Sequence, residues 1–306
     1  MYNLSEFDGW STRFLSFIGM SESRFYELEM KYLPGDEMDK LYIESYLNAL
    51  PDDIESLNIS DHGFKYIPDL SRFTKLEILY CNDNQLTSLP TLPENLKELC
   101  CSNNQLTSLP ALPQNLETLN CNNNSLNSLP ILPENLETLY CYKNQLTSLP
   151  ALPKNLEDLM CSNNQLTSLP NLPQNLKFLM CNNNQLTSLP DLPQNLKSLC
   201  CNNNQLTLPV LPKNLDHLDC DDNQLNSLLV SPEDFEKFRQ KFTQPNFGKV
   251  CTFTLRKNAD LLPDKSINFV FPPIASFCSS TPILSCNNNQ LTSLPALPEN
   301  MEHVKV

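Results

Sequence analysis

The feature that most constrains this chain is a stretch of twenty residues that repeats in tandem. Residues 96–115 read LKELCCSNNQLTSLPALPQN, and residues 116–135 read LETLNCNNNSLNSLPILPEN. The same pattern, LxxLxCxxNxLxxLPxLPxN, starts again at Leu136, Leu156, Leu176 and Leu196. A fixed period of this length indicates that each unit packs against its neighbours, so the sequence predicts a solenoid with one parallel strand per turn.

The core of the solenoid should be built from the repeated leucines and cysteines. In the unit that begins at Leu96 we expect these side chains to point inward: Leu96, Leu99, Cys101, Leu106, Leu109 and Leu112. In an LxxLxC strand the cysteine alternates to the same side as the second leucine. The sequence therefore predicts a column of small apolar thiols in the core, at Cys81, Cys101, Cys121, Cys141, Cys161, Cys181, Cys201, Cys220 and Cys286.

A disulfide framework and a zinc site are the alternatives for a chain with 13 cysteines. The column holds an odd number of cysteines, and the N-terminal residues MYNLSEFDGW show no signal peptide. A linear column at strand spacing cannot supply tetrahedral ligands, and the sequence contains no CxxC motif. Free thiols favour a reducing compartment, the cytosol or the nucleus.

Asparagines and prolines should shape the turns. We expect a ladder of asparagine side chains to turn inward and satisfy backbone groups where the chain leaves each strand, at Asn84, Asn104, Asn124, Asn144, Asn164, Asn184, Asn204, Asn223 and Asn289. Two prolines three residues apart, such as Pro110 and Pro113, bar an α-helix and favour extended polyproline-II backbone. The side opposite the strands should then be thin, and the array should curve gently.

Residues 1–53 differ from the repeats and should form a helical N-terminal cap. Helical spacing predicts one helix from Ser5 towards Phe17, a second after Ser21 or Ser23, and a third from Asp36 that ends before Pro51. The first, degenerate repeat begins at about Ile54, with its apolar positions at Ile54, Leu57, Ile59, Phe64, Ile67 and Leu70. The alternative is that these helices dock a second protein.

Regular repeats should run over residues 54–230 and return over residues 281–306. Between them, Ser231–Pro232–Glu233–Asp234 is a strong helix start and predicts a helix over residues 232–242. We interpret residues 231–280 as irregular, lengthened repeats or as an insertion.

Composition excludes several classes of function. The chain carries 35 acidic and 21 basic residues, a net charge of −14, which disfavours nucleic acid and anionic membranes as partners. No run of eighteen apolar residues predicts a membrane span. The three histidines, His62, His217 and His303, stand in no catalytic spacing, so we expect no enzyme, metal or cofactor site.

Function should therefore depend on strand positions that point outward from the core. These positions vary between repeats while the core letters stay constant, and several hold aromatic residues or methionine, which are enriched at protein interfaces. The candidate partner-binding residues are Tyr80, Cys100, Asn120, Tyr140, Tyr142, Met160, Phe178, Met180 and Cys200. Among them, Tyr140, Tyr142, Met160, Phe178 and Met180 should form a semi-apolar patch over three adjacent strands.

Units such as SNNQLTSLPALPQNLETL resemble the leucine-rich repeats of bacterial effectors of the YopM and IpaH kind. The variant LYCNDNQLTSLPTLPENLKEL is also similar to leucine-rich repeat proteins of giant DNA viruses of amoebae. The resemblance covers residues 54–228 and 281–306 and implies a leucine-rich repeat solenoid with a parallel sheet on its concave face. Some such effectors add a ubiquitin-ligase domain with a Cys-x-Asp motif, but here Cys251 precedes Thr252–Phe253.

We therefore expect a monomeric, non-enzymatic scaffold in the cytoplasm, or in the cytoplasm or nucleus of a host cell, that binds a protein partner through the concave face. The alternative function is substrate recognition in a ubiquitin-ligase-type assembly that docks through the N-terminal helices.

Overall fold

The computed structural model describes residues 2–3, 35–207, 211–212, 215–223 and 283–285. Two compact units, Met1–Gln145 and Leu146–Val306, divide the chain. The first two predicted helices, the helix over residues 232–242, Cys286 and Asn289 lie outside the described residues.

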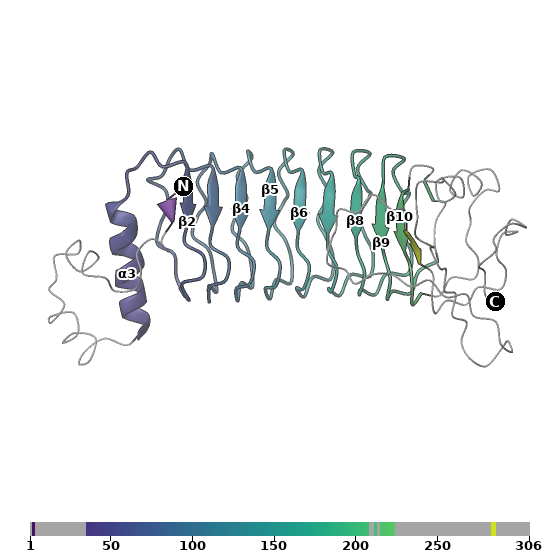
Figure 1. The fold of residues 1–306 in the computed structure, drawn as a ribbon, viewed down its shortest axis with the longest axis horizontal. Helices are drawn as coiled ribbons and strands as arrows, with labels where there is room; N and C mark the ends of the chain where they lie inside the picture. The colour runs from purple at the N-terminus through teal and green to yellow at the C-terminus, as the bar shows by residue number, and fades with distance from the viewer. Residues whose placement is uncertain (1, 4–34, 208–210, 213–214, 224–282, 286–306) are drawn as a thin grey trace, which may run out of the picture. The chain divides into compact units, whose positions relative to one another are not determined.

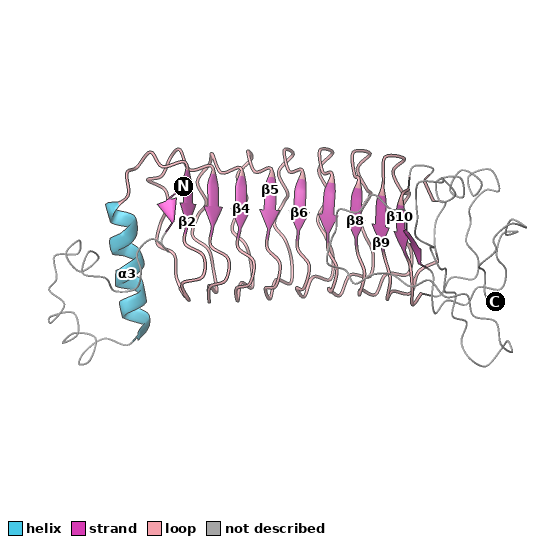
Figure 2. Cartoon of the chain, viewed as in Figure 1, coloured by secondary structure: helices cyan, strands magenta, loops and turns pink. Residues whose placement is uncertain are grey.

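The first unit holds helix α3 (Gly35–Ala49) and a parallel sheet of short strands (Figures 1 and 2). These strands are β1 (Tyr2–Asn3), β2 (Ser56–Asn58), β3 (Ile78–Tyr80), β4 (Glu98–Cys100), β5 (Thr118–Asn120) and β6 (Thr138–Tyr140). From β2 on, each strand pairs with the strand of the preceding turn. The sequence did not predict β1, which pairs with β2.

The second unit repeats this arrangement with β7 (Asp158–Met160), β8 (Phe178–Met180), β9 (Ser198–Cys200), β10 (His217–Asp219) and β11 (Ile283–Ser285). All of its strand pairs are parallel. Within each unit, equivalent residues of successive turns are register partners. Leu79 pairs with Leu99, and Leu179 pairs with Leu199. The predicted parallel solenoid is confirmed.

The core is the predicted pair of leucine and cysteine columns. Strand leucines such as Leu99 and column cysteines such as Cys101 are fully buried, because the middle residue of each strand and the first residue after the strand's end point inward. One prediction was wrong in degree: Leu109 is only half-buried, as is Leu129. Each of these leucines directly precedes the first proline of its turn, Pro110 or Pro130.

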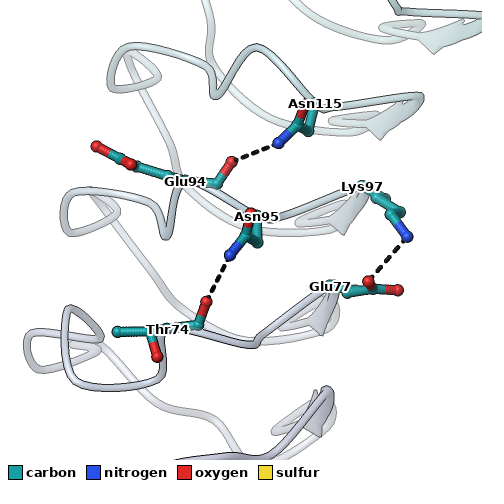
Figure 3. A network of polar contacts seen from close by, with 6 residues as sticks. All are labelled: Thr74, Glu77, Glu94, Asn95, Lys97 and Asn115. Atoms are coloured by element: carbon teal, nitrogen blue, oxygen red, sulfur yellow. Dashed lines mark hydrogen bonds and ion pairs between the residues drawn. The ribbon is translucent and has the colours of Figure 1, made fainter.

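The segments between consecutive strands in residues 50–207 contain no helix. They are held instead by hydrogen bonds from one turn to the next. The asparagine before the first leucine of each turn uses its Nδ2 to donate to a backbone carbonyl of the preceding turn: Asn95 to Thr74 O at 2.7 Å and Asn115 to Glu94 O at 3.4 Å (Figure 3). Nearby, Lys97 Nζ and Glu77 Oε1 form an ion pair at 2.8 Å (Figure 3). These contacts confirm the predicted extended backbone opposite the strands.

The inward asparagine ladder is confirmed and joins neighbouring turns. Asn104 Nδ2 donates to Cys81 O of the preceding turn at 3.0 Å and to Cys101 O of its own turn at 3.1 Å. Its Oδ1 accepts from the backbone N–H of Leu86 at 2.9 Å. One amide therefore satisfies donors and acceptors that the turn would otherwise leave buried without partners.

The residue just before each described ladder asparagine, and before His62 at the equivalent position of the first repeat, adopts a left-handed backbone. Its φ is positive at Asp61, Asp83, Asn103, Asn123, Lys143, Asn163, Asn183, Asn203 and Asp222. Asn and Asp tolerate this conformation better than other side chains with a Cβ. Lys143, with a φ of 53°, is the member of the set that lacks this tolerance.

The third predicted helix is confirmed as α3, which packs beside β1 and β2 at the end of the first unit (Figure 1). Its buried side chains are Ile43, Tyr46 and Leu47. The predicted apolar positions of the degenerate first repeat are also buried: Ile54, Leu57, Ile59, Phe64, Ile67 and Leu70. The helix contacts the first repeat, where the ring centres of Tyr42 and Phe64 lie 5.9 Å apart. The role of residues 1–53 as a terminal cap stays a prediction.

Strand β11 pairs directly with β10, with His217 opposite Ile283, although residues 220–282 separate them in the chain. This pairing favours the insertion as the interpretation of residues 231–280. The interpretation stays a prediction, because those residues lie outside the described part. In the described part no helix is long and apolar enough to cross a membrane.

Candidate functional site

Three residues form the outward face of each strand. They are the first and third residues of the strand and the residue two positions after the third. In the first unit the third strand residues form one column, Tyr80, Cys100, Asn120 and Tyr140, and all are half-buried. The structure thus places these predicted site residues side by side on one face. Tyr142 is half-buried in the next column, and its backbone N–H donates to Asn122 Oδ1 at 2.9 Å.

Polar contacts fix part of this face. Tyr80 donates its hydroxyl to Glu98 Oε1 at 2.9 Å, and Cys100 Sγ lies 3.6 Å from Ser102 Oγ. Burial, with the hydrogen bond to Glu98, raises the pKa of Tyr80 to about 12. The phenol is therefore neutral at physiological pH and presents a ring with its polar tip already bonded.

In the second unit the apolar side chains gather on β7 and β8. Met160 pairs with Met180 across these strands, and Phe178 lies two residues before Met180 on the same face. Phe178 has 40% of its surface exposed, whereas the two methionines are half-buried. We call Met160, Phe178 and Met180 the Met–Phe patch. Tyr140 and Tyr142 belong to the first unit, whereas the Met–Phe patch belongs to the second.

Cys200, another predicted site residue, has only 9% of its surface exposed. Its role in partner binding stays a prediction. Its two neighbours in the column, Met180 and Asp219, are longer side chains that flank the short thiol on both sides. Burial and the nearby charge of Asp219 raise the pKa of Cys200 to about 12, so it is not a thiolate at physiological pH.

Acidic side chains border the Met–Phe patch. Asp158 pairs in register with Phe178, and Asp219 stands two strands from Met180. Burial raises the pKa of Asp219 to about 6, with further contributions from the charges of Asp221 and Asp222. Asp158 and Asp219 are not among the site residues predicted from the sequence, although strand alternation already placed both on the outward face.

Burial shifts the pKa of several titratable side chains in the described strands. Burial lowers the pKa of His217 and raises the pKa of the column thiols Cys81, Cys101, Cys121, Cys161 and Cys181. Within the described ranges no group of three His, Cys, Asp or Glu residues is placed to hold a metal ion. What the face does provide is a row of half-buried aromatic, sulfur and amide side chains on a rigid sheet.

Residues 94–134 and 134–174 match the family model described as "Leucine Rich repeats (2 copies)". The described solenoid is a leucine-rich repeat array. This identification agrees with the twenty-residue spacing and with the parallel strands of both units. Comparison with curated protein sequences finds no match.

Solved leucine-rich repeat structures share the fold. YopM from Yersinia enterocolitica WA-314 is 31% identical with a TM-score of 0.59, over 83% of this chain and 51% of that one. YopM from Yersinia pestis, a leucine-rich effector protein, is 36% identical with a TM-score of 0.55, over 68% of this chain and 62% of that one. A Shigella effector leucine-rich repeat domain is 26% identical with a TM-score of 0.44, over 74% of this chain and 94% of that one.

The chain thus spans between half and two thirds of the length of the two YopM structures. The predicted resemblance to YopM-type leucine-rich repeats is confirmed. The similarity to giant-virus proteins stays a prediction.

Proposed function

We propose that this leucine-rich repeat protein is a non-enzymatic scaffold that binds a protein partner through the outward face of its strands, inside a cell. The observation that carries the proposal is Phe178, a large apolar side chain that is 40% exposed on the same strand as Met180 and next to the strand that holds Met160. Aromatic and methionine side chains are enriched at protein interfaces, and a cluster of them on a soluble surface commonly marks one.

The remaining outward positions support the same function. Tyr80, Tyr140 and Tyr142 present half-buried rings on the first unit. Such residues lose little conformational entropy on binding and offer both apolar area and a hydroxyl. A monomeric scaffold with one protein partner per chain is the simplest arrangement that uses these faces.

Docking through the N-terminal helices, as in a ubiquitin-ligase-type assembly, has less support. Ile43, Tyr46 and Leu47 of α3 are buried, so these apolar side chains are not available to a partner. Leu41 is the described large apolar side chain of α3 that is exposed, with 39% of its surface accessible.

The test is affinity capture from cells with the whole chain, followed by quantitative mass spectrometry. Phe178→Ala combined with Met180→Ala should lose the partner at least tenfold, because central apolar anchors dominate interface energies. Ile131→Ala is the matched control, since Ile131 is 88% exposed but lies in a turn between β5 and β6, away from the strand face. Equal recovery of every captured protein by the double variant and the control would overturn the proposed function.

A further inference from the structure

The strand face of the second unit carries charge of one sign. Its outward positions on β7 to β10 and just beyond them are Asp158, Met160, Ser162, Phe178, Met180, Asn182, Ser198, Cys200, Asn202, His217, Asp219 and Asp221. Three are aspartates and none is Lys or Arg. Burial lowers the pKa of His217, so its imidazole is neutral at physiological pH and adds no positive charge.

The acidic positions lie on both sides of the apolar anchor. Asp158 is the register partner of Phe178 on the neighbouring strand, which places it about 4.8 Å away along the sheet. On the other side, Asp219 is two strands from Met180, about 10 Å away by the same spacing. Asp221 comes two residues after Asp219 and lies at the same edge of the patch.

This acidic edge is electrostatically crowded. Asp221 donates its backbone N–H to Asp219 Oδ1 at 3.4 Å, which holds the Asp219 carboxylate against the backbone of Asp221. The charges of Asp221 and Asp222 both contribute to the raised pKa of Asp219. A cation that approaches this edge from a partner would therefore relieve repulsion that the isolated chain retains.

We infer that the Met–Phe patch binds an extended, basic segment of a partner protein, with an apolar side chain on Phe178 and Met180 and a Lys or Arg towards Asp158 and Asp219. The inference rests on the proposed function and specifies the chemistry of its partner. An extended peptide that crosses the strands advances about 3.3 Å per residue. The basic side chain towards Asp219 therefore follows the apolar anchor by about three residues, and a second basic side chain can adjoin the anchor on the Asp158 side.

The test uses a random dodecapeptide display library selected on the whole chain at low salt. Selected peptides should be enriched in Lys and Arg beside an apolar residue, with the three-residue offset. The affinity of a synthetic copy should fall about tenfold in a variant with Asp158→Asn and Asp219→Asn together, because the two ion pairs to the peptide are lost. It should also fall as the salt concentration rises.

Asp191→Asn is the matched control, because Asp191 is an exposed aspartate in a turn and its loss should leave the affinity unchanged. Circular dichroism of each variant confirms that it is folded. Three outcomes would overturn the inference: selection of acidic or uncharged peptides, no enrichment at all, or a peptide affinity that is unchanged in the double variant. If Phe178→Ala still loses the cellular partner in that case, the proposed function stands and only the basic specificity fails.

Discussion

The ladder asparagine is the residue on which each turn of the solenoid depends. Asn124 Nδ2 lies within hydrogen-bonding distance of three carbonyl oxygens, those of Cys101 at 3.0 Å, Cys121 at 3.1 Å and Asn122 at 3.1 Å. Its Oδ1 accepts from the N–H of Leu106 at 3.0 Å. The side chain is thus donor and acceptor for two turns at once, a role that only an amide of this length can fill.

Replacing this amide should cost more than removing an ordinary surface contact. Asn124→Ala should lower the free energy of unfolding by about 3 kcal/mol, because several backbone groups lose their partner at once. Asn124→Asp should be at least as damaging, since a carboxylate would face three carbonyl oxygens. Urea denaturation measures both, with Asn127→Ala at an exposed position as the control. An Asp variant as stable as wild type would contradict this role.

Lys143 should weaken the first unit through its backbone. Its φ of 53° places a long side chain in the left-handed region, where most turns of this solenoid have Asn or Asp. Lys143→Asn should therefore raise the free energy of unfolding by about 1 kcal/mol, as part of the left-handed penalty is removed. Lys197→Asn removes a lysine from an exposed position that has no positive φ and should leave stability unchanged. Equal urea midpoints for the two variants would show that charge, not conformation, sets the result.

Asp219 should make stability depend on pH. Burial raises its pKa from 3.8 to about 6 in the folded protein. Between these pH values the folded state binds more protons than the unfolded state. The free energy of unfolding therefore falls as the pH rises from 3.8 to about 6, and above pH 6 it stays below its value at pH 3.8. Asp219→Asn should be more stable than wild type at pH 7.5, by about 1 kcal/mol after allowance for partial exposure, and the difference should vanish near pH 4. Thermal unfolding at both pH values, with Asp191→Asn as the control, checks this.

At this scale the sequence predicted which residues repeat but not every contact that they make. The burial of Leu99, Cys101 and Asn84 follows from strand alternation and the period alone. The burial of Cys200 does not, because the equivalent strand position holds a half-buried thiol at Cys100 and a buried thiol at Cys200. How far one turn shields a side chain of the next turn depends on both repeats, so it cannot be predicted from the motif of a single repeat.

Among the elements, α3 closes the first unit through contacts at its C-terminal end. Arg72 Nη2 donates to the carbonyl oxygens of Leu47 and Leu50, the latter at 3.0 Å, and its guanidinium lies 4.5 Å from the ring centre of Phe73. A cation at the C-terminus of a helix satisfies its last carbonyls and opposes its dipole. The spacing of apolar residues predicted this helix, whereas its anchor comes from a residue more than twenty positions later.

Loss of this anchor should loosen the helix while leaving the strands intact. Arg72→Ala should weaken the docking of α3 by about 1–3 kcal/mol, as a charged hydrogen-bond donor is removed from two carbonyls. Hydrogen exchange should accelerate at Ile43, Tyr46 and Leu47 and stay unchanged at Leu119. Lys75→Ala is the control, because its ion pair with Asp53 at 3.8 Å is largely exposed. Uniform acceleration across the first unit would mean that the helix and the strands unfold as one.

A second set of elements, the extended segments opposite the strands, was predicted only in outline. Two prolines per turn excluded a helix there, and the structure agrees. The asparagine that precedes each turn, such as Asn95 or Asn115, received no role in the sequence analysis. Its bond to a carbonyl of the previous turn explains why it recurs on an exposed edge (Figure 3). A local motif suggests that such a residue matters, but its partner lies twenty-one residues away.

At the scale of the whole molecule, the period and the core positions are enough to predict the fold, because equivalent side chains are buried in each described turn of the array. The face that a partner would contact is different, since it is built from the positions that the repeat leaves free. The sequence placed Met160, Phe178 and Met180 together because strand register follows directly from the period. It could not supply the burial of each side chain, which decides which of those positions remain accessible.

The buried thiol columns allow the cooperativity of each unit to be measured directly. In the first unit Cys81, Cys101 and Cys121 are fully buried, and burial raises the pKa of each thiol. Because alkylation requires an exposed thiolate, native protein at pH 8 should be labelled at half-exposed Cys100 well before these three. In increasing urea, pulses of iodoacetamide followed by peptide mapping should show Cys81, Cys101 and Cys121 becoming labelled at one urea concentration, since a single turn cannot stay folded without its neighbours. Stepwise labelling from one turn to the next would contradict cooperative unfolding of the unit.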